Sequence, residues 1–280
     1  MIAYRAMLDV PRELVREVAR LLRAERRARG TRAGSRALTC WNEALLVLAW
    51  FRNQGDIALV GAGFGVSRAT AYRYRDEVVT VLAEQAPDLH DALEEVAAQG
   101  WSHVVLDGKV FRTDRCAETT LSAKGETINA WYSGKHRAPG GNIQAIVRPD
   151  GLPIWVSDVV PGHQHDITCA RVAGMLGALY WSASQLDLPT LADSGYDGPG
   201  QGIHTPIKQP DNGQVLAPAN QAYNTLLRSV RCRGERGFAL LAGRWRALRR
   251  ITASPRRIGD YARAALVLTH IEQLQLRTSC

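Results

Sequence analysis

The sequence predicts a mixed α/β domain that follows an all-α domain. Apolar residues recur at helical spacing up to about residue 99, whereas short β-rich runs alternate with helical segments from residue 100 onward. The 280 residues, 46% apolar and 22% charged, have a globular composition and suffice for two domains. We therefore expect a helical domain over residues 1–99 and an α/β domain over residues 100–280.

Positive charge is concentrated near the two ends of the chain. The formal net charge is +8, of which residues 1–40 contribute +6 and residues 228–263 contribute +9, while residues 41–227 contribute −7. Nearly all the cations are arginine, whose planar guanidinium binds phosphate in a bidentate manner. A polyanion such as DNA is the expected partner, and solvated helix faces are the alternative explanation.

Cysteine usage and hydropathy indicate the compartment. The five cysteines are an odd number without zinc-ligand spacing, which favours reduced thiols. No apolar run approaches the roughly 18 residues of a membrane span, and Arg5 and Asp9 interrupt any apolar core of a signal peptide. The expected location is the cytoplasm.

The first hundred residues are predicted to be helical. Residues 14–22 form an amphipathic basic helix, with Asp9 as its expected N-cap and Pro11 in its first turn. Residues 26–36, RRARGTRAGSR, have no apolar period and are expected to form a linker or a flexible arm. A second helix is expected over residues 41–51.

Residues 56–79, DIALVGAGFGVSRATAYRYRDEVV, predict a helix-turn-helix. Gly61 is a small residue where the two helices would touch, Gly65 is suited to the turn, and Ser67 is suited to cap the second helix. The residues expected to contact DNA are Ser67, Arg68, Tyr72 and Arg73. The alternative is a generic helical hairpin without a role in DNA binding.

Strands and helices then follow in a definite order. Residues 103–111 form a strand with Asp107 in its middle, and residues 142–160 form a hairpin around a turn at Gly151. The later elements are a helix capped by Asp166, a strand over residues 188–193, a strand over 203–207, a helix from about 218 to 241, and a last helix over 256–275.

This order is the connectivity of a ribonuclease H-like fold, a mixed five-stranded sheet whose first and fourth strands are neighbours. Asp107 lies on the first strand and Asp193 ends the fourth, and a glutamate on the following helix can join them. A cluster of carboxylates usually binds divalent cations, and two Mg²⁺ ions suit phosphodiester displacement. Two alternatives stay open: Asp193 is a turn residue, and Glu235 pairs with Arg231.

Several strings along the chain resemble a known family. They are VVLDGKV, WYSGKHR, IVRPDGLPIWVS, PGHQHDI, LADSGYDG, TPIK and RGERGFALL. Together they resemble the DDE transposases of bacterial insertion sequences (insertion sequence 5-like), in the branch related to Harbinger transposases, and GVSRATAYRYRDEV resembles the helix-turn-helix of that family. The resemblance implies DNA cleavage and strand joining with two Mg²⁺ or Mn²⁺ ions at terminal inverted repeats.

Carried over to this sequence, the resemblance implies the catalytic and metal-binding triad Asp107, Asp193 and Glu235, with Asp166 as an alternative second metal ligand. Relatives often have Tyr seven residues before the glutamate, Arg four before it and Lys seven after it. Here these positions hold Arg228, Arg231 and Ala242, and Arg244 is the expected substitute for the lysine. The residues expected to hold phosphates are Lys135, His136, Arg137, Arg231, Arg236 and Arg244.

The sequence thus predicts a transposase that binds double-stranded DNA at element ends and target, as a homodimer on DNA and without membrane association. Two alternative functions are also compatible with the sequence. One is a catalytically impaired, transposase-derived DNA-binding protein, and the other is a ribonuclease H-like nuclease without strand transfer.

Overall fold

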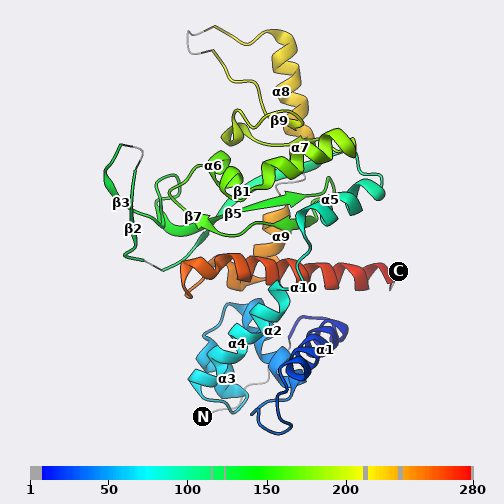
Figure 1. The fold of residues 1–280 in the computed structure, drawn as a ribbon, viewed down its shortest axis with the longest axis vertical. Coiled ribbons are helices and arrows are strands. Elements are labelled where there is room, and N and C mark those ends of the chain that lie inside the picture. Colours follow the sequence, from blue (N-terminus) through cyan, green and yellow to red (C-terminus); the bar gives the residue numbers. More distant parts are fainter. Residues whose placement is uncertain (1–7, 115, 123, 211–213, 233–235, 279–280) are drawn as a thin grey trace. The chain divides into compact units, whose positions relative to one another are not determined.

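The structure is a computed structural model that describes residues 8–278 except 115, 123, 211–213 and 233–235 (Figure 1). The chain divides into two compact units. The helical unit comprises the chain up to Ala86, Arg244–Arg250 and the chain from Asp260 onward. The sheet unit comprises Pro87–Gly243 and Ile251–Gly259.

The helical unit holds α1 (Arg12–Ala28), α2 (Cys40–Asn53), α3 (Ile57–Gly63), α4 (Arg68–Ala83), the 3₁₀ helix η2 (Arg246–Arg249) and most of α10 (Ile258–Thr278). The helices of the sheet unit are α5 (Leu89–Ala98), α6 (Asp166–Val172), α7 (Met175–Gln185), α8 (Pro218–Arg231), α9 (Arg236–Arg244), η1 (Ser194–Tyr196) and η3 (Pro255–Arg257). Its strands are β1 (Val104–Arg112), β2 (Thr119–Leu121), β3 (Thr127–Asn129), β4 (Tyr132–Ser133), β5 (Ala138–Val147), β6 (Pro153–Val156), β7 (Val160–Pro161), β8 (Thr190–Leu191) and β9 (Ile203–His204).

The division differs from the boundary expected after residue 99. Helix α5 ends before Gly100 as expected, but its buried Leu93 belongs to the same apolar core as Leu179 of α7, so α5 is part of the sheet unit. Conversely, Tyr261 of α10 packs its ring 5.6 Å from the ring of Trp50, which places α10 in the helical unit. Tertiary burial, which no local pattern reveals, decides both assignments.

The Asp9 cap expected for α1 is not formed. Pro11 occupies the N-cap position, and no side chain caps the helix. The Asp9 carboxylate instead accepts hydrogen bonds from Arg52, at 2.5 Å, and from Arg244, at 2.8 Å. Hydrogen bonds from Arg244 and Arg52 lower the pKa of Asp9, because they favour the ionised carboxylate.

Of the two expectations for residues 26–36, the linker is confirmed, because most of the stretch lies between α1 and α2, whereas the flexible arm is not. The first residues of the stretch continue α1, and Arg26 forms an ion pair with Glu43, whose side chain is fully buried. At the other end, Arg36 forms an ion pair with Glu77 of α4. These pairs fix both ends of the stretch, since a buried carboxylate needs a cationic partner.

The burial of Glu43 predicts a pH-dependent stability of the helical unit. Desolvation, followed by repulsion from Glu77, raises the pKa of Glu43 to about 7. The pKa of Glu43 is higher in the folded than in the unfolded protein, so folding favours the protonated carboxyl group. The contribution of Glu43 to the free energy of unfolding is therefore favourable at low pH and is lost as pH rises from about 4.5 to 7. The free energy of urea unfolding should therefore fall by roughly 2–3 kcal/mol between about pH 5 and 8, relative to Glu43→Gln. Parallel pH profiles of the two proteins would contradict this expectation.

A tight turn joins α3 to α4. Gly65 adopts φ +71°, a conformation that favours glycine, and the Ser67 hydroxyl accepts a hydrogen bond from the Thr70 amide at 3.3 Å. At Gly61 a Cβ atom would lie 2.5 Å from the Cβ of Ala71, so the close approach of the two helices requires glycine there. The small, turn and capping positions expected from the sequence are thus occupied as predicted.

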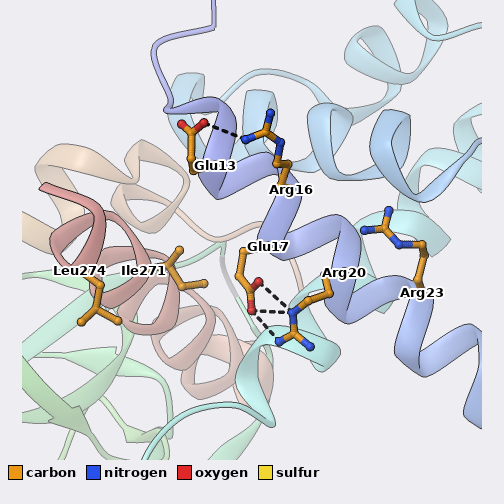
Figure 2. A pocket seen from close by; sticks show the side chains of 7 residues that line it. All are labelled: Glu13, Arg16, Glu17, Arg20, Arg23, Ile271 and Leu274. Carbon is orange, nitrogen blue, oxygen red and sulfur yellow. Dashed lines mark hydrogen bonds and ion pairs between the residues drawn. The ribbon is translucent and has the colours of Figure 1, made fainter. Parts of the chain in front are cut away.

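A hollow of about 470 Å³ lies between α1 and α10 within the helical unit. Figure 2 shows Ile271 and Leu274 on α10 facing a row of charged α1 side chains. In that row, the Glu17 carboxylate accepts hydrogen bonds from Arg20, so the charge of Arg20 is already balanced.

The sheet has the mixed connectivity expected from the sequence. Strand β5 pairs antiparallel with β6 and with β1, whereas β1 pairs parallel with β8 and β8 pairs parallel with β9. The first expected strand therefore lies between the second and the fourth, as in ribonuclease H-like folds. The short strands β4 and β7 also pair with β5, and β2 and β3 form a separate hairpin, which the sequence did not predict.

Two expected helices are interrupted, and one expected cap is absent. Gly174, at φ +66°, separates α6 from α7, which the sequence predicted as one helix. The expected helix over 218–241 consists of α8 and α9, with residues 233–235 outside the described part of the chain. Asp166 is the first residue of α6 and does not cap it, since His165 occupies the N-cap position.

Helices cover both faces of the sheet (Figure 1). Residues of α5, α6 and α7 share a core with Leu106 of β1 and Ile146 of β5. On the other face, Phe238 of α9 packs its ring 5.7 Å from the ring of Phe111. Within the described residues, no helix is long and apolar enough to cross a lipid bilayer.

Candidate active site

Asp107 and Asp193 lie at the same level on neighbouring parallel strands. Val105 of β1 is paired with Leu191 of β8, and each aspartate follows its paired residue by two positions. Side chains two residues apart in extended chain lie on one face, and adjacent strands are about 4.8 Å apart. Asp193 is itself extended, with φ −84° and ψ 179°, and follows the end of β8, so the topology places it beside Asp107. Its Oδ1 accepts a hydrogen bond from the Gly195 amide at 2.8 Å, so Asp193 also has the turn role kept as the alternative.

The beginning of α9 covers the face of the sheet on which Asp107 lies. Along β1, Lys109 and Phe111 share the face of Asp107, and both contact Phe238: the Lys109 ammonium lies 6.0 Å from the ring centre. At Gly237 a Cβ atom would lie 2.7 Å from Val147, so the first turn of α9 rests closely on β5. Glu235, the third predicted carboxylate, directly precedes α9 and lies outside the described residues.

Asp166, the first residue of α6, approaches Asp193 from the side of the sheet that Gly108 faces, opposite to the face of Asp107. From the Cβ position of Gly195, Oδ1 of Asp193 lies at 2.9 Å and Oδ2 of Asp166 at 3.2 Å, so the two oxygens are no more than about 6 Å apart. The Asn142 amide donates to Oδ1 of Asp166 at 2.8 Å, and the Lys135 ammonium lies 3.5 Å from Oδ2. Asp193 and Asp166, the two candidates for the second metal ligand, are therefore close together.

The three aspartates make the region electronegative. Burial, followed by the charges of Asp166, Asp107 and Asp193, raises the pKa of Tyr196 well above its usual value. Burial and the charge of Asp166 also raise the pKa of Cys169 to about 12. Both groups therefore stay protonated near neutral pH.

The donor set suits a hard divalent cation. Carboxylate oxygens are the ligands that Mg²⁺ prefers, and a partly buried cluster of carboxylates is stabilised by such a cation. Within the described residues, no three His, Cys, Asp or Glu side chains are close enough together to hold a metal ion. The described carboxylates therefore do not complete a metal site by themselves, and the predicted triad of Asp107 and Asp193 also requires Glu235, which lies outside the described residues.

A cavity of about 220 Å³ opens beside Asp166. Lys135 and His136, two of the predicted phosphate-binding residues, line it together with His165. Arg137, which follows them, is exposed and adopts φ +49°. The turn before β5 therefore places cationic side chains next to the carboxylates, as a phosphate-binding role requires.

The other predicted phosphate-binding arginines differ in exposure. Arg236 is exposed at the first position of α9, but Arg231 is only 7% exposed, so burial argues against a direct phosphate contact. Arg244, the expected substitute for the missing lysine, belongs to the helical unit. Its guanidinium donates to Glu272 and Asp9 within the helical unit, and these carboxylates occupy its donors.

The predicted DNA-contacting residues lie at the N-terminal half of α4. Ser67, Arg68 and Arg73 are exposed, although the Ser67 hydroxyl is engaged in capping. Tyr72 is half-buried, with the Arg68 guanidinium 5.7 Å and the Arg75 guanidinium 4.6 Å from its ring centre. Arg68 and Arg73 are therefore available to an external partner, and Tyr72 packs between cationic groups.

Three residues near the carboxylates were missed by the sequence analysis: Asn142, Gln144 and Tyr196. The signal for the first two was present, because polar residues two apart in an otherwise apolar strand share one face. Tyr196 gave no signal of its own in the string DSGYDG.

A comparison with protein families identifies the family of this chain. Residues 106–270 match the family described as DDE superfamily endonuclease. A search of curated proteins found no match. One similar solved structure is a Mos1 transposase paired-end complex with left transposon end, which is 9% identical over 83% of this chain and 78% of that chain, with a TM-score of 0.21. Another is a pre-cleavage Mos1 transpososome, which is 9% identical over 95% of this chain and 98% of that chain, also with a TM-score of 0.21. Since the family match spans more than half of the sequence, the chain belongs to the DDE superfamily endonucleases.

Proposed function

We propose that this protein is a transposase of a bacterial insertion sequence, which cleaves DNA at the element ends and joins them to target DNA. The observation that carries the proposal is the placement of Asp107 and Asp193 at one level of two parallel strands, with α9 covering the face of Asp107. The family membership supports endonuclease chemistry at this position.

In this proposal Asp107, Asp193 and Glu235 hold two Mg²⁺ or Mn²⁺ ions. When bound, such ions activate the attacking water or 3′-hydroxyl and stabilise the leaving oxygen. Lys135, His136 and Arg236 hold phosphates beside the scissile bond, where their exposure allows contact with DNA. Asp166 serves as an additional oxygen donor.

The helical unit supplies recognition of DNA in this proposal. The glycine turn between α3 and α4, and the exposed arginines of α4, are typical of a helix-turn-helix whose second helix enters the major groove. The bound sequence would be the terminal repeats of the element. Acting on two ends at once favours a homodimer on DNA.

Neutralising arginines of α4 should reduce both affinity for DNA and its salt dependence. In Arg68→Gln/Arg73→Gln, the slope of log affinity against log salt should become less steep by roughly 0.9 for each phosphate that the variant no longer neutralises. Arg20→Gln is a suitable control, because Glu17 already balances the Arg20 charge, and its slope should match the wild type. Fluorescence anisotropy with labelled terminal-repeat duplex measures these slopes. Equal slopes for all three proteins would exclude α4 from the interface.

A strand-transfer assay tests the proposed activity. Protein, labelled terminal-repeat DNA and a target plasmid are incubated with Mg²⁺, and the expected products are nicked ends and joined molecules. Binding without products would indicate a DNA-binding protein that has lost catalysis, and nicking without joining would indicate a nuclease. Asp193→Asn and Asp166→Asn in the same assay rank the two carboxylates. If Asp166→Asn abolishes cutting and Asp193→Asn does not, the triad proposed above is wrong.

A further inference from the structure

A chain of buried polar side chains connects η1 to Asp166. The Tyr196 hydroxyl donates to the Gln144 carbonyl oxygen, the Gln144 amide donates to Oδ1 of Asn142 at 2.8 Å, and the Asn142 amide donates to Oδ1 of Asp166 at 2.8 Å. Gln144 is fully buried, while Tyr196 and Asn142 are 1% and 2% exposed. Burying this many polar groups is costly unless each finds a partner, and here the partners form one continuous sequence.

The direction of these hydrogen bonds suits an ionised Asp166. Each side chain accepts from the residue before it and donates to the next, so the chain ends with an N–H group pointing at the carboxylate. The reverse direction would turn the carbonyl oxygen of Asn142 toward a carboxylate, which accepts hydrogen bonds and cannot donate when ionised. The carboxylate at one end therefore fixes the direction of the two amides, and the Tyr196 hydroxyl at the other end completes the sequence by donating to Gln144.

The chain also decides which oxygen of Asp166 faces the site. Oδ1 is held by Asn142, which leaves Oδ2 on the side of Gly195 and Asp193. The Lys135 ammonium lies 3.5 Å from this Oδ2, and its side chain is 72% exposed, so it can leave when another cation binds.

The absence of a side chain at residue 108 makes room for this arrangement. A Cβ atom on Gly108 would lie 2.8 Å from each of three atoms: Oδ1 of Asp166, Nε2 of Gln144 and the Tyr196 hydroxyl. All three atoms therefore converge on the strand residue next to Asp107, on the opposite face of β1.

We propose that Tyr196, Gln144 and Asn142 are positioning residues that orient Asp166 as an additional metal-binding carboxylate beside Asp193. This inference rests on the proposed function. These hydrogen-bonded side chains then have a role beyond stabilising the fold. Asp166 is an additional ligand beside the triad and is not one of its three members.

The test uses Tyr196→Phe, which removes one hydroxyl, with Ser182→Ala as the matched control. Ser182 is also fully buried, and its hydroxyl donates to backbone carbonyls of Leu179 and Leu188 within the same unit. The probe is Mn²⁺ alone, titrated into the full chain without DNA and followed by electron paramagnetic resonance, while thermal unfolding reports stability. We expect Tyr196→Phe to weaken Mn²⁺ binding about 10-fold, the lower end of the effect of removing groups that orient metal ligands. Ser182→Ala should bind Mn²⁺ as the wild type does.

A second background separates positioning from general destabilisation. In Asp166→Asn, the additional substitution Tyr196→Phe should cause no further loss of Mn²⁺ affinity, because the residue through which it acts is already altered. Asn142→Leu, which removes the last donor of the chain, should weaken Mn²⁺ binding at least as much as Tyr196→Phe.

Three results would overturn the positioning role: unchanged Mn²⁺ affinity in Tyr196→Phe, an equal loss in Ser182→Ala, or additive losses in the Asp166→Asn background. Failure of the proposed function looks different. In that case Asp107→Asn and Asp193→Asn would bind Mn²⁺ as tightly as the wild type, or the wild type would give no DNA products.

Discussion

Asp107→Asn should abolish DNA cleavage while leaving the fold and DNA binding intact. Asp107 lies at the level of Asp193 on the neighbouring strand, and the first turn of α9 covers the same face. An amide there keeps the shape of the side chain but removes the charge that a divalent cation requires. Losing about 4 kcal/mol of transition-state stabilisation corresponds to a decrease of roughly 10³-fold in the cleavage rate. Single-turnover cleavage of labelled terminal-repeat DNA measures this rate.

Asp187→Asn is the matched control for this substitution. Asp187 is an exposed aspartate of the sheet unit at φ +49°, a conformation that asparagine also tolerates. Its variant should cleave at the wild-type rate. If Asp107→Asn retained more than about a tenth of the activity, Asp107 would not be a ligand of an essential metal ion.

Trp245→Ala should destabilise the helical unit and remove DNA binding, although residue 245 is far in sequence from α3 and α4. Trp245 is the largest fully buried side chain, its indole N–H donates to Thr269 at 2.9 Å, and its ring lies 6.2 Å from that of Phe51. Truncating a buried tryptophan costs about 3–5 kcal/mol. Urea unfolding, together with hydrogen exchange of α2 and α10, measures the loss.

Two control measurements distinguish destabilisation of the helical unit from destabilisation of the whole protein. Leu59→Ala, at a residue that is 74% exposed, should change the unfolding free energy by no more than about 0.5 kcal/mol. Mn²⁺ binding by Trp245→Ala should stay at the wild-type level, since the carboxylates belong to the sheet unit. Unaltered DNA affinity in Trp245→Ala would show that DNA recognition does not require the packed helical unit.

The sheet connectivity could be predicted because strands leave local signals. The run around Asp107 is apolar and β-branched, the hairpin has its glycine at residue 151, and the strand before Asp193 is short and buried. That order is the connectivity of ribonuclease H-like folds, in which the first and fourth strands are neighbours, and this likeness predicts the neighbouring positions of Asp107 and Asp193. The turn between α3 and α4 could also be predicted from the sequence, because the preferences of residues for turns and for N-cap positions are local.

Long-range ion pairs could not be predicted in the same way. Asp9 has the sequence position of an N-cap, yet Arg244, more than two hundred residues away, competes for it. Arg26 and Arg36 lie in a stretch without apolar period, yet they form ion pairs with Glu43 and Glu77, which are distant in sequence. A charged side chain has no periodic signature that identifies its partner, so three-dimensional contacts alone reveal these pairs.

The division of the chain into interleaved units has a consequence for biosynthesis. Trp245 and α10, which complete the core of the helical unit, are translated after the whole of β1 to β9. Domains usually fold as they emerge from the ribosome, N-terminal first, but here α1 to α4 must wait for partners encoded near the other terminus. Nascent chains would therefore contain nearly the whole sheet unit before the helical unit can pack.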